Sequence, residues 1–89
     1  MIDFSHGNSM KKFENQMLVC QDVSAQIAGG NEDIFGVMVE SHLVEGRQDL
    51  VEGKSLTYGQ SITDACIGWE DTETLLAQLN DAVATRKNT

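Results

Sequence analysis

The sequence has no proline, few basic residues and no long apolar run. None of its apolar stretches approaches the roughly 20 residues that a transmembrane helix needs, so we expect no membrane span. Lys and Arg number 6 against 14 Asp and Glu, which gives a formal net charge of -8. Nucleic acids and anionic membranes bind clusters of Lys and Arg, so this balance argues against both as partners. The acidic excess suits a chain that binds cations.

Cysteine is also scarce, and its use indicates a reducing compartment. The chain has 2 cysteines, Cys20 and Cys66, and no segment that resembles a signal peptide. They form no disulfide framework, so we interpret them as reduced thiols of a cytoplasmic protein. With 89 residues and 40% hydrophobic composition, the chain is expected to be one small folded domain or a piece of a larger one.

The first half of the chain predicts a strand, a helix and a second strand. Residues 1–4 indicate the end of a strand, and Asn8 or Ser9 in the polar turn that follows is expected to cap a helix from Met10. Apolar residues then recur at steps of three and four until Gly29-Gly30 ends the helix. Residues 34–39 form a continuous apolar run, which is typical of a strand covered on both faces in a parallel sheet.

The second half predicts a long loop and a last helix. Residues 41–61 are polar, and a connection of this length is uncommon in a compact domain unless it is functional. After a second apolar stretch over residues 62–69, Asp71 or Thr72 is expected to cap a helix whose apolar face consists of Leu75, Leu76, Leu79 and Val83. The order β-α-β-loop-α predicts an α/β chain with parallel strands. Two strands cannot bury both faces of a sheet, so we expect either a fragment or an oligomer.

Chemistry-bearing residues stand at the carboxyl ends of both predicted strands. His6 follows the first strand closely, and Glu40 directly follows the second. Carboxyl ends of parallel strands point the same way, and the long loop can return Asp64 to the same region. One imidazole and two carboxylates suit a divalent transition metal such as Mn²⁺, Fe²⁺, Co²⁺ or Zn²⁺. An ordinary polar loop histidine is the competing interpretation of His6.

The other candidate residues have structural interpretations. His42 is expected to be an ordinary residue of the polar loop, and Cys20 a core residue on the apolar face of the first helix. Cys66 lies near Asp64 in sequence but is expected to be a small buried apolar residue. Trp69 is assigned to a core or an interface. The glycines match neither the dinucleotide-binding fingerprint nor the P-loop.

Three segments of the sequence resemble one enzyme family. They are residues 1–9 (MIDFSHGNS), residues 36–46 (GVMVESHLVEG) and residues 58–70 (YGQSITDACIGWE). Together they resemble bacterial 3-deoxy-D-arabino-heptulosonate 7-phosphate (DAHP) synthases of the phenylalanine-sensitive type. The resemblance runs over the whole chain, which corresponds to about the last quarter of that family's sequence.

The resemblance implies a fold and a reaction. Residues 1–89 would be a single partial domain, the last two βα units of a TIM (β/α)8 barrel. The family condenses phosphoenolpyruvate with erythrose 4-phosphate in the first step of the shikimate route to aromatic amino acids. It uses a divalent metal held by Cys, His, Glu and Asp, and the last three match His6, Glu40 and Asp64. The Cys ligand, most phosphate-binding residues and the inhibitor pocket would lie outside this chain, so we expect the chain alone to be inactive.

Two further interpretations stay open. The chain could be a non-catalytic α/β module that self-associates to bury its strands, or a small free-standing binder of divalent metals. Because a monomer would expose sheet edges and apolar helix faces, we expect a homo-oligomer.

Overall fold

The computed structural model describes residues 1–88 and contains two short parallel strands and two long helices. Strand β1 (Ile2–Asp3) pairs in parallel with β2 (Val37–Met38), with Ile2 opposite Val37 and Asp3 opposite Met38. A 3-10 helix, η1 (His6–Ser9), and helix α1 (Asn15–Ala28) connect the strands, and α2 (Trp69–Lys87) follows the long loop. The expected order β-α-β-loop-α is confirmed, and so is the parallel strand pair.

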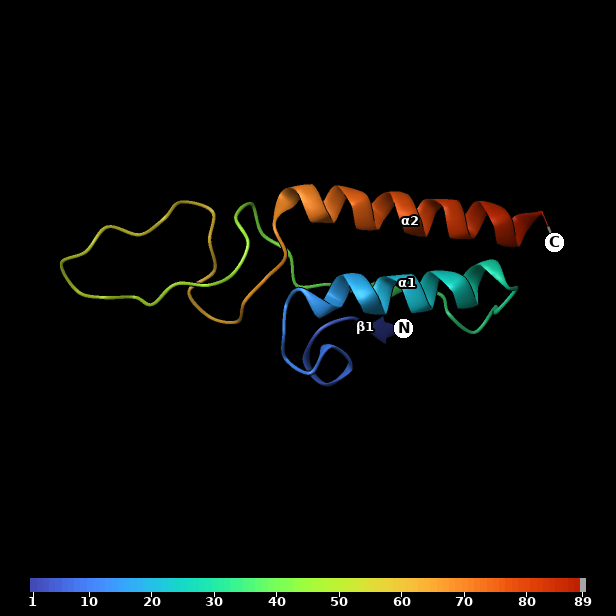
Figure 1. Cartoon of the computed structure of the whole chain (residues 1–89), viewed down its shortest axis with the longest axis horizontal. Coiled ribbons are helices and arrows are strands. Elements are labelled where there is room, and N and C mark those ends of the chain that lie inside the picture. Colours follow the sequence, from blue (N-terminus) through green and yellow to red (C-terminus); the bar gives the residue numbers. More distant parts are fainter. Residues whose placement is uncertain (89) are drawn as a thin grey trace.

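The helices lie side by side and run in the same direction, with β1 beside α1 (Figure 1). Both strands and helices contribute to one core. Its buried members are Phe4, Cys20, Val23, Ile27, Ile34, Ile67, Leu75 and Ala82. Burial of Cys20 in this core confirms its structural interpretation. Among the described residues, neither helix is both long and apolar enough to cross a membrane.

The first helix begins later than the sequence pattern suggests. Met10 and Lys11 have positive φ angles of 55° and 60°, which a continuous α-helix cannot accommodate. The turn η1 therefore precedes them, and α1 starts only at Asn15. The expected caps have other partners, since Asn8 donates to the carbonyl of Asp3 and Ser9 to that of His6. The predicted helix start at Met10 is wrong, and that side chain is 74% exposed.

The second strand and the last helix also differ from expectation. Only Val37 and Met38 pair with β1, and Phe35 within the apolar run is 82% exposed, so the run is not covered on both faces in this chain. Helix α2 begins at Trp69, which is half exposed rather than a core residue. It packs through Thr72, Leu75 and Ala82, whereas Leu76 lies beside this stripe and is exposed.

The long loop projects away from the helices and folds back on itself (Figure 1). Isolated bridges join its two arms, pairing Gly46 with Cys66 and Arg47 with Ser61. The amide of Gln48 reinforces the pairing by donating to the carbonyl of Gln60 at 3.0 Å. The returning arm therefore runs beside the outgoing arm and carries Asp64 back toward the ends of the strands.

Candidate metal centre

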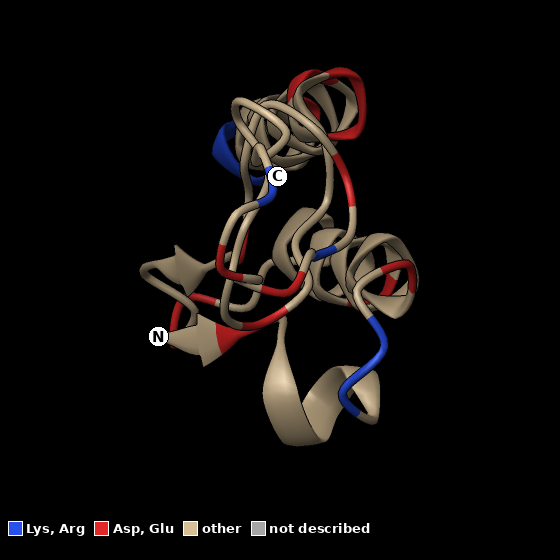
Figure 2. Cartoon of the chain, turned by 90° about the vertical axis from the view of Figure 1, so that its left-hand side faces the viewer, with Lys and Arg blue, Asp and Glu red and all other residues tan. Residues whose placement is uncertain are grey.

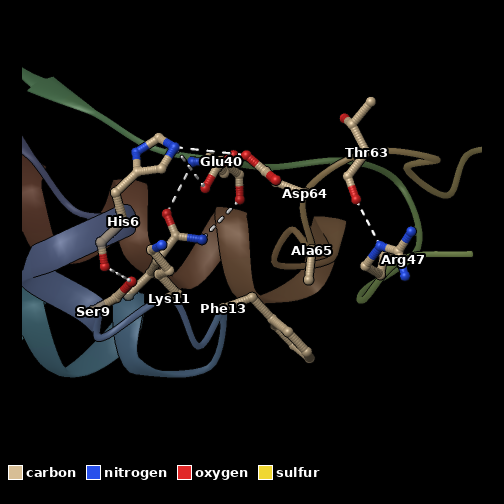
Figure 3. Close-up of a pocket in the computed structure, with 10 residues that line it drawn as sticks. His6, Ser9, Lys11, Phe13, Glu40, Arg47, Thr63, Asp64 and Ala65 are labelled. Atoms are coloured by element: carbon tan, nitrogen blue, oxygen red, sulfur yellow. Dashed lines mark hydrogen bonds and ion pairs between the residues drawn. The ribbon is translucent and has the colours of Figure 1, made fainter.

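The three residues predicted for a metal site converge beyond the carboxyl ends of the strands. His6 opens η1 after β1, Glu40 follows β2, and Asp64 lies on the returning arm of the loop. Nε2 of His6 is 3.9 Å from Oε1 of Glu40 and 3.6 Å from Oδ2 of Asp64 (Figure 3). One ligand atom from each residue lies within 4.8 Å of the other two. The expected convergence of strand ends is therefore present in the structure.

The other ring nitrogen of His6 is bound by a residue that the sequence interpretation did not assign. Nδ1 lies 2.9 Å from Oδ2 of Asp3 and 2.8 Å from the hydroxyl of Ser5. The backbone N–H of Ser5 donates to Oδ1 of Asp3 at 2.8 Å, which fixes the carboxylate. A neutral His6 that donates its Nδ1 proton to Asp3 directs its Nε2 lone pair at Glu40 and Asp64. In the sequence, Asp3 stands out only as a charged residue within an otherwise apolar strand.

These neighbours also shift protonation equilibria. The hydrogen bond that His6 donates to the Asp3 carboxylate raises the pKa of His6 above its ordinary 6.5, and the negative charges of Glu40, Asp3 and Asp64 raise it further. Hydrogen bonds from Ser5 and His6 lower the pKa of Asp3. His6 is also held at a φ of 52°, a sparsely populated conformation of the kind that clusters at functional sites.

Glu40 is fixed through its main chain. The buried side-chain amide of Gln16, on α1, donates to the carbonyl of Glu40 and accepts from its N–H. The N–H of Ile67 donates to the same carbonyl at 3.0 Å. Gln16 had no sequence signal, because it stands among apolar residues of a helix without any motif of its own.

A cavity of about 380 Å³ opens over the three residues. Its lining comes from η1, the link to α1, the first turn of α1, the segment after β2 and both arms of the loop. It comprises His6, Ser9, Lys11, Phe13, Gln16, Glu40, Arg47, Thr63, Asp64 and Ala65. Arg47 donates through Nε to the carbonyl of Thr63 at 2.7 Å and pairs with the carboxylate of Asp49. Seen from the loop end, acidic segments outnumber basic ones (Figure 2). The cavity thus combines an acidic centre with the cations of Lys11 and Arg47.

The remaining candidates lie outside the centre. His42 is exposed and accepts the N–H of Leu43 at its Nδ1, as an ordinary loop residue. Cys66 is buried and its Sγ lies 3.5 Å from the carbonyl of Asp64. Burial is the largest cause that raises the pKa of Cys66, followed by the charge of Glu40. This burial agrees with the interpretation of Cys66 as a small buried apolar residue.

Fold and site together define a class of protein: an α/β chain with a candidate divalent-metal centre beyond the carboxyl ends of parallel strands. Comparison with known families is more specific. Residues 1–77 match the DAHP synthetase I family. The chain belongs to that family.

Individual relatives agree with the family match. The chain is 72% identical to the phospho-2-dehydro-3-deoxyheptonate aldolase of Haemophilus influenzae over 87 residues, which are 98% of this chain and 24% of that protein. Identity to the Phe-sensitive aldolase of Escherichia coli K12 is 67%, over 98% of this chain and 25% of that protein. The Trp-sensitive aldolase of the same organism is 54% identical. The phenylalanine-sensitive type is thus the closer of these two, as the sequence segments predicted.

A solved structure shares the fold. The aldolase of Francisella tularensis SCHU S4 superposes with a TM-score of 0.90 at 51% identity, over 97% of this chain and 25% of that one. The chain therefore spans about a quarter of the length of the relatives that it matches.

Proposed function

We propose that the chain forms the part of a DAHP synthase that supplies three of its metal ligands. The whole enzyme would condense phosphoenolpyruvate with erythrose 4-phosphate, the first step of the shikimate route. The observation that carries the proposal is the convergence of His6, Glu40 and Asp64 within 4.8 Å. Family membership supports the reaction, and the names of the relatives support the aldolase class.

In this proposal the chain is two consecutive βα units, the last two of a TIM (β/α)8 barrel. The parallel register of β1 and β2 and the parallel direction of the two helices suit such units (Figure 1). The likeness to a longer aldolase structure also supports this assignment. Residues 1–89 would then be one partial domain, and the rest of the barrel would cover the strand edges.

The chemistry of the three side chains fits a divalent transition metal. One imidazole nitrogen and two carboxylates are suitable ligands for Mn²⁺, Fe²⁺, Co²⁺ or Zn²⁺. The fourth ligand, a cysteine in the family, would come from an earlier segment of the enzyme, because neither Cys20 nor Cys66, both of which are buried, matches it. When bound, a divalent cation supplies Lewis acidity toward the aldehyde oxygen of erythrose 4-phosphate.

The chain's own residues would prepare the centre and leave most substrate binding to other parts of the enzyme. Asp3 holds the proton of His6 at Nδ1, while Glu40 and Asp64 present carboxylates to a cation. Two phosphorylated substrates require several cationic or amide partners. The described cavity offers only Lys11 and Arg47 among basic side chains, so the isolated chain would be inactive. The whole enzyme would work in the cytoplasm as a homo-oligomer.

A hybrid enzyme tests the proposal. The Haemophilus influenzae aldolase, with its matching segment replaced by this chain, would keep every part that the chain lacks. We expect the hybrid to form DAHP with a divalent metal, to lose activity on chelation and to regain it with Mn²⁺. A folded hybrid that is inactive with each of the four metals, beside an active parent aldolase, would contradict the proposal.

Self-association is the second candidate, because the chain exposes large apolar side chains. Phe35 is 82% exposed, and Leu18 and Leu76 on the two helices are 61% and 55% exposed. Association between copies of the chain would bury these side chains. Light scattering of the isolated chain separates the two cases: a defined oligomer supports a self-associating module, whereas a cooperatively melting monomer contradicts it.

A further inference from the structure

Gln16 is a fully buried polar residue whose side-chain amide is bonded at both ends to one residue. Nε2 donates to the main-chain carbonyl of Glu40 at 3.0 Å, and Oε1 accepts from the N–H of Glu40 at 2.9 Å. Breaking either bond would leave a buried polar group without a partner, which is costly. The amide therefore pairs with Glu40 much as a neighbouring strand would pair with it.

Glu40 stands where the sheet no longer provides such a partner. The last backbone bond from the β1 segment runs from the N–H of Phe4 to the carbonyl of Met38. Beyond this point the side-chain amide of Gln16 donates to the carbonyl of Glu40. The N–H of Ile67, on the returning arm of the loop, donates to the same carbonyl. Glu40 is thus tied to α1 and to the segment that carries Asp64.

We infer that Gln16 is a positioning residue of the metal centre. By fixing the main chain of Glu40 to the first turn of α1, it sets where the Glu40 carboxylate lies relative to His6, which belongs to the turn before that helix. Oε1 of Glu40 lies 3.9 Å from Nε2 of His6 under this constraint. The inference rests on the proposed function, because it takes Glu40 as a metal ligand.

Mn²⁺ binding by the hybrid enzyme, measured by equilibrium dialysis, tests the inference. Gln16→Met keeps the length of the side chain and removes both hydrogen bonds. Residues that orient metal ligands typically contribute about 10–100-fold to metal affinity, and we expect a loss of that size. Gln21→Met, at an exposed site on the same helix, should retain the affinity of the unsubstituted hybrid.

A stability control separates positioning from general packing. Val23→Ala removes buried apolar volume from α1 at a residue that does not bond to Glu40, so it should lower the melting temperature and leave Mn²⁺ affinity unchanged. Gln16→Glu keeps an acceptor for the N–H of Glu40 and loses the amide donor, so its affinity should lie between those of the unsubstituted hybrid and Gln16→Met.

Each outcome decides the question. A folded Gln16→Met or Gln16→Glu hybrid with the Mn²⁺ affinity of the Gln21→Met control overturns the inference and leaves the proposed function intact. If neither variant folds, Gln16 is a structural residue and the inference is overturned as well. If the unsubstituted hybrid folds but retains no Mn²⁺ while the parent aldolase does, the proposed function fails first.

Discussion

Nε2 of His6 lies 3.6 Å from Oδ2 of Asp64, although α1, β2 and the long loop separate the two residues in sequence. The other nitrogen of the same ring lies 2.9 Å from Oδ2 of Asp3. The imidazole thus has a carboxylate at each nitrogen, and the two carboxylates have different consequences. Asp3 orients the ring, whereas Asp64 and Glu40 provide negative charge where a cation would bind.

Removing either carboxylate of the centre should abolish tight metal binding. In the hybrid enzyme, Glu40→Ala or Asp64→Ala leaves two of the three side chains and halves the carboxylate charge. We expect Mn²⁺ affinity in equilibrium dialysis to fall by at least the ~10-fold that loss of a supporting residue causes, and turnover to fall with it. Glu73→Ala, at an exposed position of α2, is the matched control. Near-normal metal content and activity in both variants would contradict the assignment of Glu40 and Asp64 as metal ligands.

Asp3→Asn should weaken the centre without removing a ligand. The amide lacks the negative charge of the carboxylate and can also donate an N–H to Nδ1, so the tautomer with its proton at Nδ1 is no longer fixed. We expect Mn²⁺ affinity to fall by roughly 10–100-fold. Asp22→Asn, on the exposed face of α1, should bind Mn²⁺ normally. Equal affinities in the two variants would show that Asp3 does not orient His6.

Metal affinity should rise with pH across the titration of His6. Its pKa in the metal-free chain is raised above 6.5, chiefly by the hydrogen bond to Asp3. Below that pKa both ring nitrogens carry protons, and a cation must displace the proton at Nε2. Mn²⁺ affinity should therefore increase as pH rises through the raised pKa and then level off. Asp3→Asn removes the largest cause of the increase, so its transition should move to lower pH, and an unshifted transition would count against this account.

Leu75 and Leu76 offer a matched pair for core packing. Leu75 is 1% exposed and Leu76 is 55% exposed on the same helix. Leu75→Ala should lower the free energy of unfolding by about 2–5 kcal/mol, because it leaves a cavity in the core. Leu76→Ala should change it by about 0.5 kcal/mol or less. Urea unfolding of the chain, followed by circular dichroism, measures both; comparable losses would contradict the packing of α2 on α1.

The thiol of Cys20 should be unreactive in the folded chain. It is fully buried, and burial is the main cause that raises its pKa, against a smaller lowering by the bond to Ser24. Only the thiolate reacts with alkylating agents, so labelling by iodoacetamide at neutral pH should be slow until urea unfolds the chain. Rapid labelling under native conditions would place Cys20 outside the core.

The arrangement of the strands and of His6, Glu40 and Asp64 could be predicted because it depends on few rules. Parallel strands have their carboxyl ends at one edge, so residues that directly follow them must come close together. The return of Asp64 needed only a loop of sufficient length. No such rule predicts the hydrogen bond from the Gln48 side chain to the main-chain carbonyl of Gln60, which joins the two arms of the loop.

The predictions that were wrong concern features that depend on tertiary contacts. The apolar spacing of Met10 with Phe13 indicated a helix, but the positive φ angles at Met10 and Lys11 interrupt it. The apolar stripe of α2 runs through Ala82 rather than Leu76, since contact with α1 selects the buried face. Gln16 could not be found from sequence, because its role comes from the position of Glu40 in space.

The most direct test of the central claim is to detect the nitrogen of His6 on the bound metal. Electron spin-echo envelope modulation of the Mn²⁺-loaded hybrid reports nitrogen nuclei coordinated to the ion. The proposed centre predicts an imidazole nitrogen signal that is present in the unsubstituted hybrid and in Glu73→Ala, and absent in His6→Gln. A nitrogen signal that persists unchanged in His6→Gln, or a Mn²⁺-loaded hybrid that shows none, would contradict the account.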